Sequence, residues 1–137
     1  MKRKIRIQRG TPDVYYHDFN LRLEEFEIEV ETGMVVLDAI HLIQADEAPD
    51  LAVRWNCKAG KCGSCSAEIN GKPRLMCMTR MNDLIEETPE GTNISVRPMK
   101  TFPHIKDLVT DVSWNYEMAE KVVPIKGPDE KDWVFSQ

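Results

Sequence analysis

The feature that most constrains this chain is the spacing of its cysteines. The four of them, in the pattern C-x4-C-x2-C-x11-C, are Cys57, Cys62, Cys65 and Cys77. Three thiols within nine residues force the backbone between them to curl around whatever the sulfurs bind. Gly60 and Gly63 lie in this segment, and glycine tolerates the positive φ angles that such a curl requires. The spacing predicts a loop around an object larger than one ion, with backbone N–H groups directed at the sulfurs.

A predicted hairpin returns the fourth cysteine to this loop. Asn70-Gly71 suits a two-residue turn with positive φ at both positions. Counting ladder partners outward from the turn places Cys77 opposite Ser64 and beside Cys65. Pro73 cannot donate a ladder hydrogen bond, so we expect this hairpin at a sheet edge. Its strands are expected at residues 66–69 and 72–76.

The remaining periodicity predicts a small α+β sheet with one helix packed on it. Apolar and polar residues alternate in three further expected strands, at residues 4–9, 26–30 and 94–96. Helical spacing predicts a short amphipathic helix that carries Val36, Leu37, Ile40 and Ile43, with Asp38 near its start. We expect a turn at residues 86–91.

From Thr101 onward the character of the sequence changes. Apolar residues recur at helical spacing and predict a helix that contains Ile105, Leu108, Val109 and Val112. The segment after it mixes charges with proline and glycine, as linkers do, yet carries Trp133 and Phe135. We therefore expect residues 101–137 to form a connecting helix and linker, distinct from a folded domain at residues 1–100.

Composition and simple motifs exclude several classes of function. With 18 basic against 23 acidic residues, the net charge of -5 offers no surplus for a nucleic-acid backbone. The longest apolar run, residues 34–37, is far too short to span a membrane, and no export signal precedes the first strand. We expect no nucleic-acid partner, no direct membrane insertion and a cytosolic chain with reduced thiols. No nucleophile–base arrangement or nucleotide motif is present, so no catalytic residue is expected.

Spacing of the type C-x4-C-x2-C with a distant fourth cysteine is typical of plant-type iron–sulfur loops. A structural zinc site usually combines two C-x2-4-C knuckles, whereas one knuckle here accompanies two scattered cysteines, so zinc is the less favoured alternative. A disulfide framework disagrees with a reducing compartment. A Rieske centre needs two histidine ligands. The three histidines are far from the loop in sequence, and we expect surface or core positions for His17, His41 and His104.

Several residues near the cysteines have expected supporting roles. We expect the loop to be shaped, and its donors placed, by Gly60, Gly63 and Ser64. Lys58 and Lys61 are interpreted as solvated loop lysines, with offset of the charge of a bound cluster or steering of an acidic partner as the alternatives. Arg54 is expected to anchor the loop or to contact a partner protein, and a surface salt bridge is the competing interpretation.

These residues resemble the iron–sulfur subunit of succinate dehydrogenase and fumarate reductase. The matching stretches are RWNC at 54–57, GKCGSC at 60–65, ING at 69–71, LMC at 75–77 and IKDLVTD at 105–111. The gap of eleven residues before Cys77 distinguishes this family from stand-alone plant-type ferredoxins, which carry their last cysteine much further away. The likeness runs from about residue 4 to residue 117, and residues 56–81 look most like the actinobacterial type.

The resemblance implies a β-grasp ferredoxin-like domain at residues 1–100 with a short C-terminal helical extension. It implies one 2Fe–2S cluster on the four cysteines, which would accept electrons from an FAD-containing flavoprotein subunit for relay toward quinone. In this family a second, helical domain carries further clusters and meets the membrane-anchor subunits. The implied location is cytoplasmic and peripheral, on the inner face of the cell membrane.

No cysteine follows Cys77, so these 137 residues hold no ligands for a second domain's clusters. A truncated chain, a split subunit and a freestanding carrier each fit this observation. The alternative function is therefore a freestanding soluble 2Fe–2S ferredoxin-type electron carrier.

Overall fold

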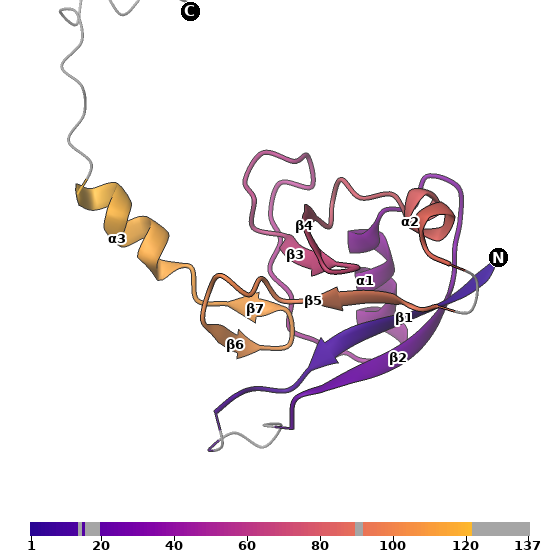
Figure 1. Ribbon diagram of the computed structural model, residues 1–137, viewed down its shortest axis with the longest axis horizontal. Coiled ribbons are helices and arrows are strands. Elements are labelled where there is room, and N and C mark those ends of the chain that lie inside the picture. The colour runs from indigo at the N-terminus through magenta and orange to yellow at the C-terminus, as the bar shows by residue number, and fades with distance from the viewer. Residues whose placement is uncertain (14, 16–19, 90–91, 122–137) are drawn as a thin grey trace, which may run out of the picture.

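Five strands form one mixed sheet in the order β2-β1-β5-β3-β4 (Figure 1). The computed structural model describes residues 1–13, 15, 20–89 and 92–121. β1 pairs antiparallel with β2 and parallel with β5, and the hairpin β3–β4 extends the sheet through β3. The strands are β1 (Lys2–Arg9), β2 (Arg22–Glu29), β3 (Ser66–Ile69), β4 (Lys72–Leu75) and β5 (Ile94–Arg97).

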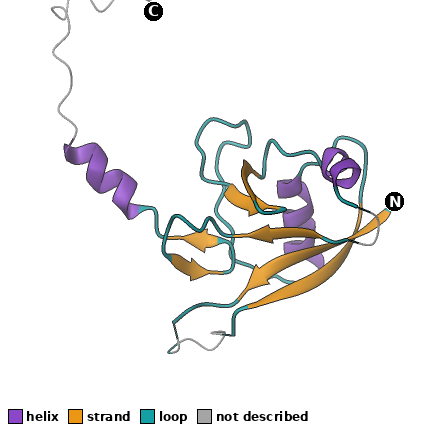
Figure 2. Ribbon diagram, in the orientation of Figure 1, coloured by secondary structure: helices purple, strands orange, loops and turns teal. Residues whose placement is uncertain are grey.

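One face of the sheet is covered by α1 (Val36–Asp46), which crosses behind the strands in Figure 2. The predicted apolar stripe is fully buried there and consists of Val36, Leu37, Ile40 and Ile43. It meets the inward residues of β1, Ile5 and Ile7, which are also fully buried. The Asp38 carboxylate accepts the N–H of Val35 at 3.1 Å and satisfies one donor at the start of the helix. The predicted alternation and helical period are thus confirmed.

The β3–β4 hairpin has the predicted register. Asn70 and Gly71 form its turn, with φ of 51° and 80°, and β4 with Pro73 is an edge strand. Pairing begins at Ile69 with Lys72 and reaches Ser66 with Leu75. One step further out, the N–H of Met76 donates to the Cys65 carbonyl at 3.2 Å. The hairpin therefore carries residue 77 back beside residue 65, as the counting predicted.

A second helix was missed by the sequence analysis. α2 (Met81–Glu87) includes Glu86 and Glu87, where we expected only a turn. Its buried side chains, Met81 and Leu84, are three residues apart and therefore share one face of a helical turn. Residues 90–91 of the expected turn lie outside the described residues.

The helix expected at residues 105–112 is wrong. A two-stranded hairpin, β6 (His104–Lys106) and β7 (Val109–Thr110), occupies this segment, and Asp107 between the strands has a left-handed φ of 49°. Burial of Asp107 and Leu108 against the domain outweighs the helical spacing. The helix α3 (Ser113–Lys121) begins only afterwards. The expected linker, with Trp133 and Phe135, lies outside the described residues.

The α3 helix projects away from the sheet at the end of the described chain (Figure 1), and none of its side chains is buried. Among the residues described, no helix is both long and apolar enough to cross a membrane. The expected α+β class, with a β-grasp ferredoxin-like sheet and a short C-terminal helical extension, is confirmed.

Candidate iron–sulfur site

The loop over residues 57–65 curls around the sulfur of Cys57. Left-handed φ angles of 56°, 71° and 73° bend the backbone at Lys58, Gly60 and Gly63. Three backbone N–H groups point at the Cys57 sulfur from 3.3 Å, those of Ala59, Lys61 and Cys62. The curl and the N–H groups directed at sulfur are therefore present as predicted, and both glycines adopt the backbone conformation expected of them.

The other sulfurs also receive donors from this backbone. Cys62 Sγ accepts the N–H of Ser64 at 3.4 Å and lies 2.9 Å from the Ser64 hydroxyl. Cys65 Sγ accepts the N–H of Cys77, also at 3.4 Å. Backbone N–H groups join the cysteines in twos, because the Cys62 N–H donates to the Cys57 sulfur as the Cys77 N–H does to the Cys65 sulfur. The thiols of Cys62 and Cys57, and those of Cys65 and Cys77, are also within hydrogen-bonding reach of each other. The four thiols are thus arranged as two neighbouring pairs.

The amino end of α1 holds the segment that carries Cys77. The first N–H groups of a helix have no partners within the helix itself. Here the N–H of Val36 donates to the Thr79 carbonyl at 2.9 Å, and the N–H of Leu37 donates to the Met76 carbonyl at 3.0 Å. The position of Cys77 is therefore set from two directions, by the register of the hairpin and by the helix.

The two pairs differ in exposure, and Cys62 of one pair differs in acidity from Cys65 of the other. Cys62 is exposed and Cys57 partly so, whereas Cys65 and Cys77 are buried. The Ser64 hydroxyl, helped by backbone N–H groups, lowers the pKa of the Cys62 thiol to about 6. Burial raises the pKa of the Cys65 thiol. Because the thiolate is the metal-binding form, Cys62 reaches that form at lower pH than Cys65 does.

An all-sulfur donor set surrounded by N–H groups fits an anionic iron–sulfur group. Two neighbouring thiol pairs also match the requirement of a 2Fe–2S cluster, in which each of two irons takes two thiolates. Among the described residues, there is no group of three or more His, Cys, Asp or Glu side chains that could hold a single metal ion. The residues present therefore fit the diiron group.

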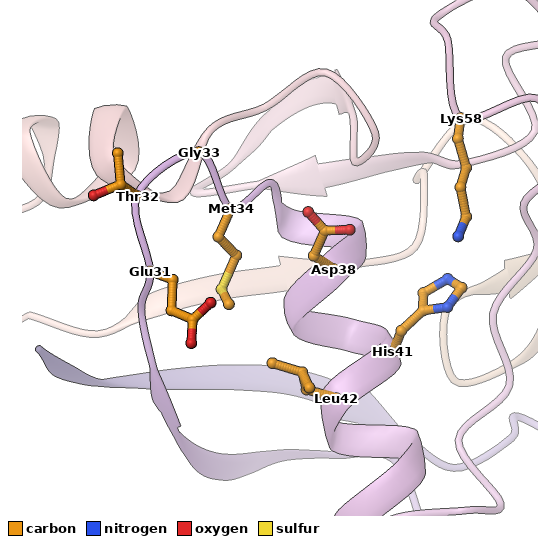
Figure 3. A pocket seen from close by; sticks show the side chains of 8 residues that line it. All are labelled: Glu31, Thr32, Gly33, Met34, Asp38, His41, Leu42 and Lys58. Atoms are coloured by element: carbon orange, nitrogen blue, oxygen red, sulfur yellow. The ribbon is translucent and has the colours of Figure 1, made fainter.

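One histidine lies closer to the loop than its sequence position indicates. The ring of His41, from α1, lies 4.9 Å from that of Trp55, and the Lys58 ammonium lies 4.4 Å from the centre of the Trp55 ring. Figure 3 shows the side chains of Lys58 and His41 turned toward each other beside a pocket along α1. Burial, and then the charge of Lys58, lower the pKa of His41 despite nearby Asp38. No spacing in the sequence signals this cluster.

Arg54 anchors the start of the loop, one of the roles expected of it. Its Nη1 donates to the Thr110 carbonyl at 3.0 Å, which ties the segment before Cys57 to β7. Lys61 is exposed, and Lys58 lies over an aromatic ring rather than only in solvent. Sequence reasoning missed Asp107, which accepts the Ala52 N–H at 2.8 Å from the same hairpin.

Known proteins are similar to this chain in sequence and in fold. The succinate dehydrogenase iron-sulfur subunit of Coxiella burnetii is 35% identical over 120 residues, which cover 86% of this chain and 47% of that subunit. The fumarate reductase iron-sulfur subunit of Haemophilus influenzae is 29% identical over 120 residues, 88% of this chain and 43% of that subunit. The chain thus spans about half the length of these curated relatives.

A solved structure, the Mycobacterium smegmatis Sdh1 complex in the apo form, contains a chain with a TM-score of 0.78 and 51% identity. The match covers 94% of this chain and 50% of that one. The family model of the 2Fe-2S iron-sulfur cluster binding domain matches residues 4–117. The protein therefore belongs to the family of 2Fe-2S iron-sulfur cluster binding domains, and its cofactor is a 2Fe–2S cluster.

Proposed function

We propose that this chain is the 2Fe–2S-carrying part of an iron–sulfur subunit of succinate dehydrogenase or fumarate reductase, with its four cysteines as the iron ligands. The observation that carries the assignment is the pairing of the thiols, Cys57 with Cys62 and Cys65 with Cys77. The relatives named as subunits of these two enzymes support the choice of complex.

The residues around the sulfurs suit an electron carrier. A bound 2Fe–2S cluster supplies one-electron chemistry and becomes more negative on reduction. The N–H groups aimed at Cys57, Cys62 and Cys65 stabilise that added charge. Burial of Cys65 and Cys77 excludes water from one side, and the partly exposed pair leaves the other side accessible to an electron donor. No residue of this chain has a catalytic role in the proposal.

The proposed partners follow from the same relatives. Electrons arrive from an FAD-containing flavoprotein subunit and continue toward quinone at membrane-anchor subunits, on the inner face of the cell membrane. Residues 101–137 then connect the cluster domain at 1–100 to a second domain that would complete the subunit. Matches covering 43% to 47% of the curated relatives support a further half of similar size.

Reconstitution of the chain with iron and sulfide tests the cluster and its ligands. We expect two irons and two sulfides per chain and an EPR signal on reduction with dithionite. Cys57→Ala, Cys62→Ala, Cys65→Ala and Cys77→Ala should each abolish or badly destabilise the signal. Lys72→Ala alters an exposed side chain in the hairpin that leads to Cys77 and serves as the matched control. An unchanged signal in any of the cysteine variants would refute that residue as a ligand.

Co-expression with a flavoprotein subunit of succinate dehydrogenase tests the partner. A stable complex that contains both FAD and this chain, and in which succinate reduces the cluster, is the expected result. The Cys62→Ala variant controls for binding without electron transfer. A reconstituted chain that never binds the flavoprotein, yet exchanges electrons with soluble donors, would favour the freestanding carrier instead.

A further inference from the structure

The hairpin β6–β7 holds the segment that leads into the cysteine loop. Both backbone polar groups of Ala52 are hydrogen-bonded to this hairpin. Its N–H donates to Asp107 Oδ2 at 2.8 Å, and its carbonyl accepts the N–H of Leu108 at 3.2 Å. Two residues later, Arg54 donates to the Thr110 carbonyl at 3.0 Å. One short hairpin, far away in sequence, thus contacts this segment at two successive points.

Asp107 is itself rigidly held. Its side chain is fully buried, and its second oxygen, Oδ1, accepts the N–H of Gly10 at 2.7 Å. Its own N–H donates to the Gly10 carbonyl at 2.8 Å. The Arg9 guanidinium lies 3.4 Å from Oδ1 and balances the buried charge. Asp107 therefore links the end of β1 to the segment before the loop.

The held segment has no regular secondary structure between Leu51 and Cys57. Its path cannot come from a ladder or a helix, so it depends on tertiary contacts: those at Ala52 and Arg54, the Gln44 amide on the Leu51 carbonyl, and the ring of Trp55 against His41. Cys57 follows Arg54 by three residues and is the sulfur toward which three N–H groups point. A shift of this segment would change the distances from those donors to the Cys57 sulfur.

We propose that Asp107, assisted by Arg54, is a positioning residue for the iron ligand Cys57, and that the hairpin thereby adjusts the reduction potential of the cluster. The proposal rests on the proposed function, because it takes Cys57 to be a ligand. Donors to a ligand sulfur favour the reduced, more negative cluster. Weakening the hairpin contacts should therefore move the midpoint potential to more negative values.

The test compares Asp107→Asn and Arg54→Gln in the full chain. Asparagine tolerates the left-handed backbone at 107 but offers one oxygen to the two N–H donors that the carboxylate serves. In the apo chain we expect the Ala52 amide to exchange with deuterium about tenfold faster, the factor for losing a hydrogen bond to a charged group. In the reconstituted chain we expect a more negative potential, an altered EPR line shape and faster loss of the cluster.

Two controls separate positioning from general weakening. Ile28→Val destabilises the core at β2, the edge of the sheet opposite β4, and Glu25→Gln removes an exposed charge that pairs with Lys4 and Arg6. Both should keep the wild-type potential and line shape. The proposal is overturned if Asp107→Asn and Arg54→Gln also keep them, or if Ile28→Val reproduces the change.

The outcomes remain separable from those of the proposed function. Should the Asp107→Asn variant fail to fold, the Arg54→Gln variant, which changes a partly buried side chain, tests the effect of the hairpin on the potential by itself. Should the wild-type chain hold no cluster, the proposed function fails, while deuterium exchange at Ala52 still tests the hairpin contacts. Wild-type exchange rates at Ala52 in Asp107→Asn would remove the physical basis of the proposal.

Discussion

At the scale of single residues, the loop depends on backbone conformations that side chains usually resist. Lys58 adopts a left-handed φ of 56° although it is not a glycine. Gly60 and Gly63 have similar angles, but only Gly60 has a neighbour at the site of a missing Cβ, the Met78 side chain at 2.9 Å. The two glycines are therefore required for different reasons, one for conformation alone and one for conformation and space.

Gly60→Ala should lower the free energy of unfolding of the apo chain by roughly 1–2 kcal/mol, because a Cβ strains the left-handed backbone. It should also displace Met78 and reduce cluster uptake. Urea denaturation and iron analysis measure the two effects. Gly33→Ala has a similar φ of 84° with no atom in the way and lies outside the loop, so it isolates the strain. If Gly60→Ala and Gly33→Ala take up cluster equally well, the role of Gly60 in the loop is wrong.

Cys62 should react with iodoacetamide before Cys65 in the apo chain. A pKa lowered to about 6 means that the thiolate is present above pH 6 and is lost as the pH falls through that value. Mass spectrometry at pH 7 should find Cys62 alkylated well before buried Cys65, whose pKa is raised. Ser64→Ala should move the onset to higher pH, and Ser66→Ala should not. Equal rates at Cys62 and Cys65 would contradict the assigned difference.

At the scale of elements, the β3–β4 hairpin was predictable and α2 and β6–β7 were not. Asn70-Gly71 defines its own turn locally, so strand register and the place of Cys77 followed from counting. α2 has only seven residues, too few for a clear period. In β6–β7 the apolar spacing indicated a helix, but the contacts of Asp107 with Gly10 and Ala52 stabilise a hairpin instead. Those contacts join residues that no local pattern relates.

Asn70→Ala should destabilise the apo chain by about 2 kcal/mol. The Asn70 amide accepts the N–H of Ser95 at 3.0 Å and donates to the Thr88 hydroxyl at 3.1 Å, and both partners lose a bond. Because the turn sets the register of Cys77, iron content after reconstitution should also fall. Lys72→Ala, an exposed change in the same hairpin, should stay within about 0.5 kcal/mol of wild type in urea denaturation. Equal stability of the two variants would contradict the role of Asn70.

At the scale of the whole molecule, the end of the folded domain is marked by the burial of side chains rather than by the change in composition. The composition changes at residue 101, where we predicted the end of the domain, and the cluster domain at 1–100 remains a prediction. Leu108 and Thr110 are nevertheless buried, while every side chain of α3 is exposed. We infer that the hairpin β6–β7 contributes to the stability of the folded domain and that α3 does not.

Two shortened chains test this division. A chain of residues 1–112 lacks only exposed side chains among those described, so its unfolding free energy should match the full chain within about 0.5 kcal/mol. A chain of residues 1–101 loses buried Leu108 and the hydrogen bonds of Asp107, and should be less stable by about 3 kcal/mol or more. Thermal and urea unfolding followed by circular dichroism provide the measurement. If both chains equal the full one, the domain ends at residue 100 as the composition predicts.

What the amino-acid sequence determined by itself was local: the cysteine spacing, the turn at Asn70-Gly71, the alternating strands and the amphipathic helix. Each depends on residues within a few positions of one another, and together they were enough to indicate the iron–sulfur loop. Only the tertiary structure decided which distant groups hold that loop, namely the amino end of α1 and the buried carboxylate of Asp107. These contacts form because burial leaves polar groups that must find partners, and which partners they find depends on the whole packed chain.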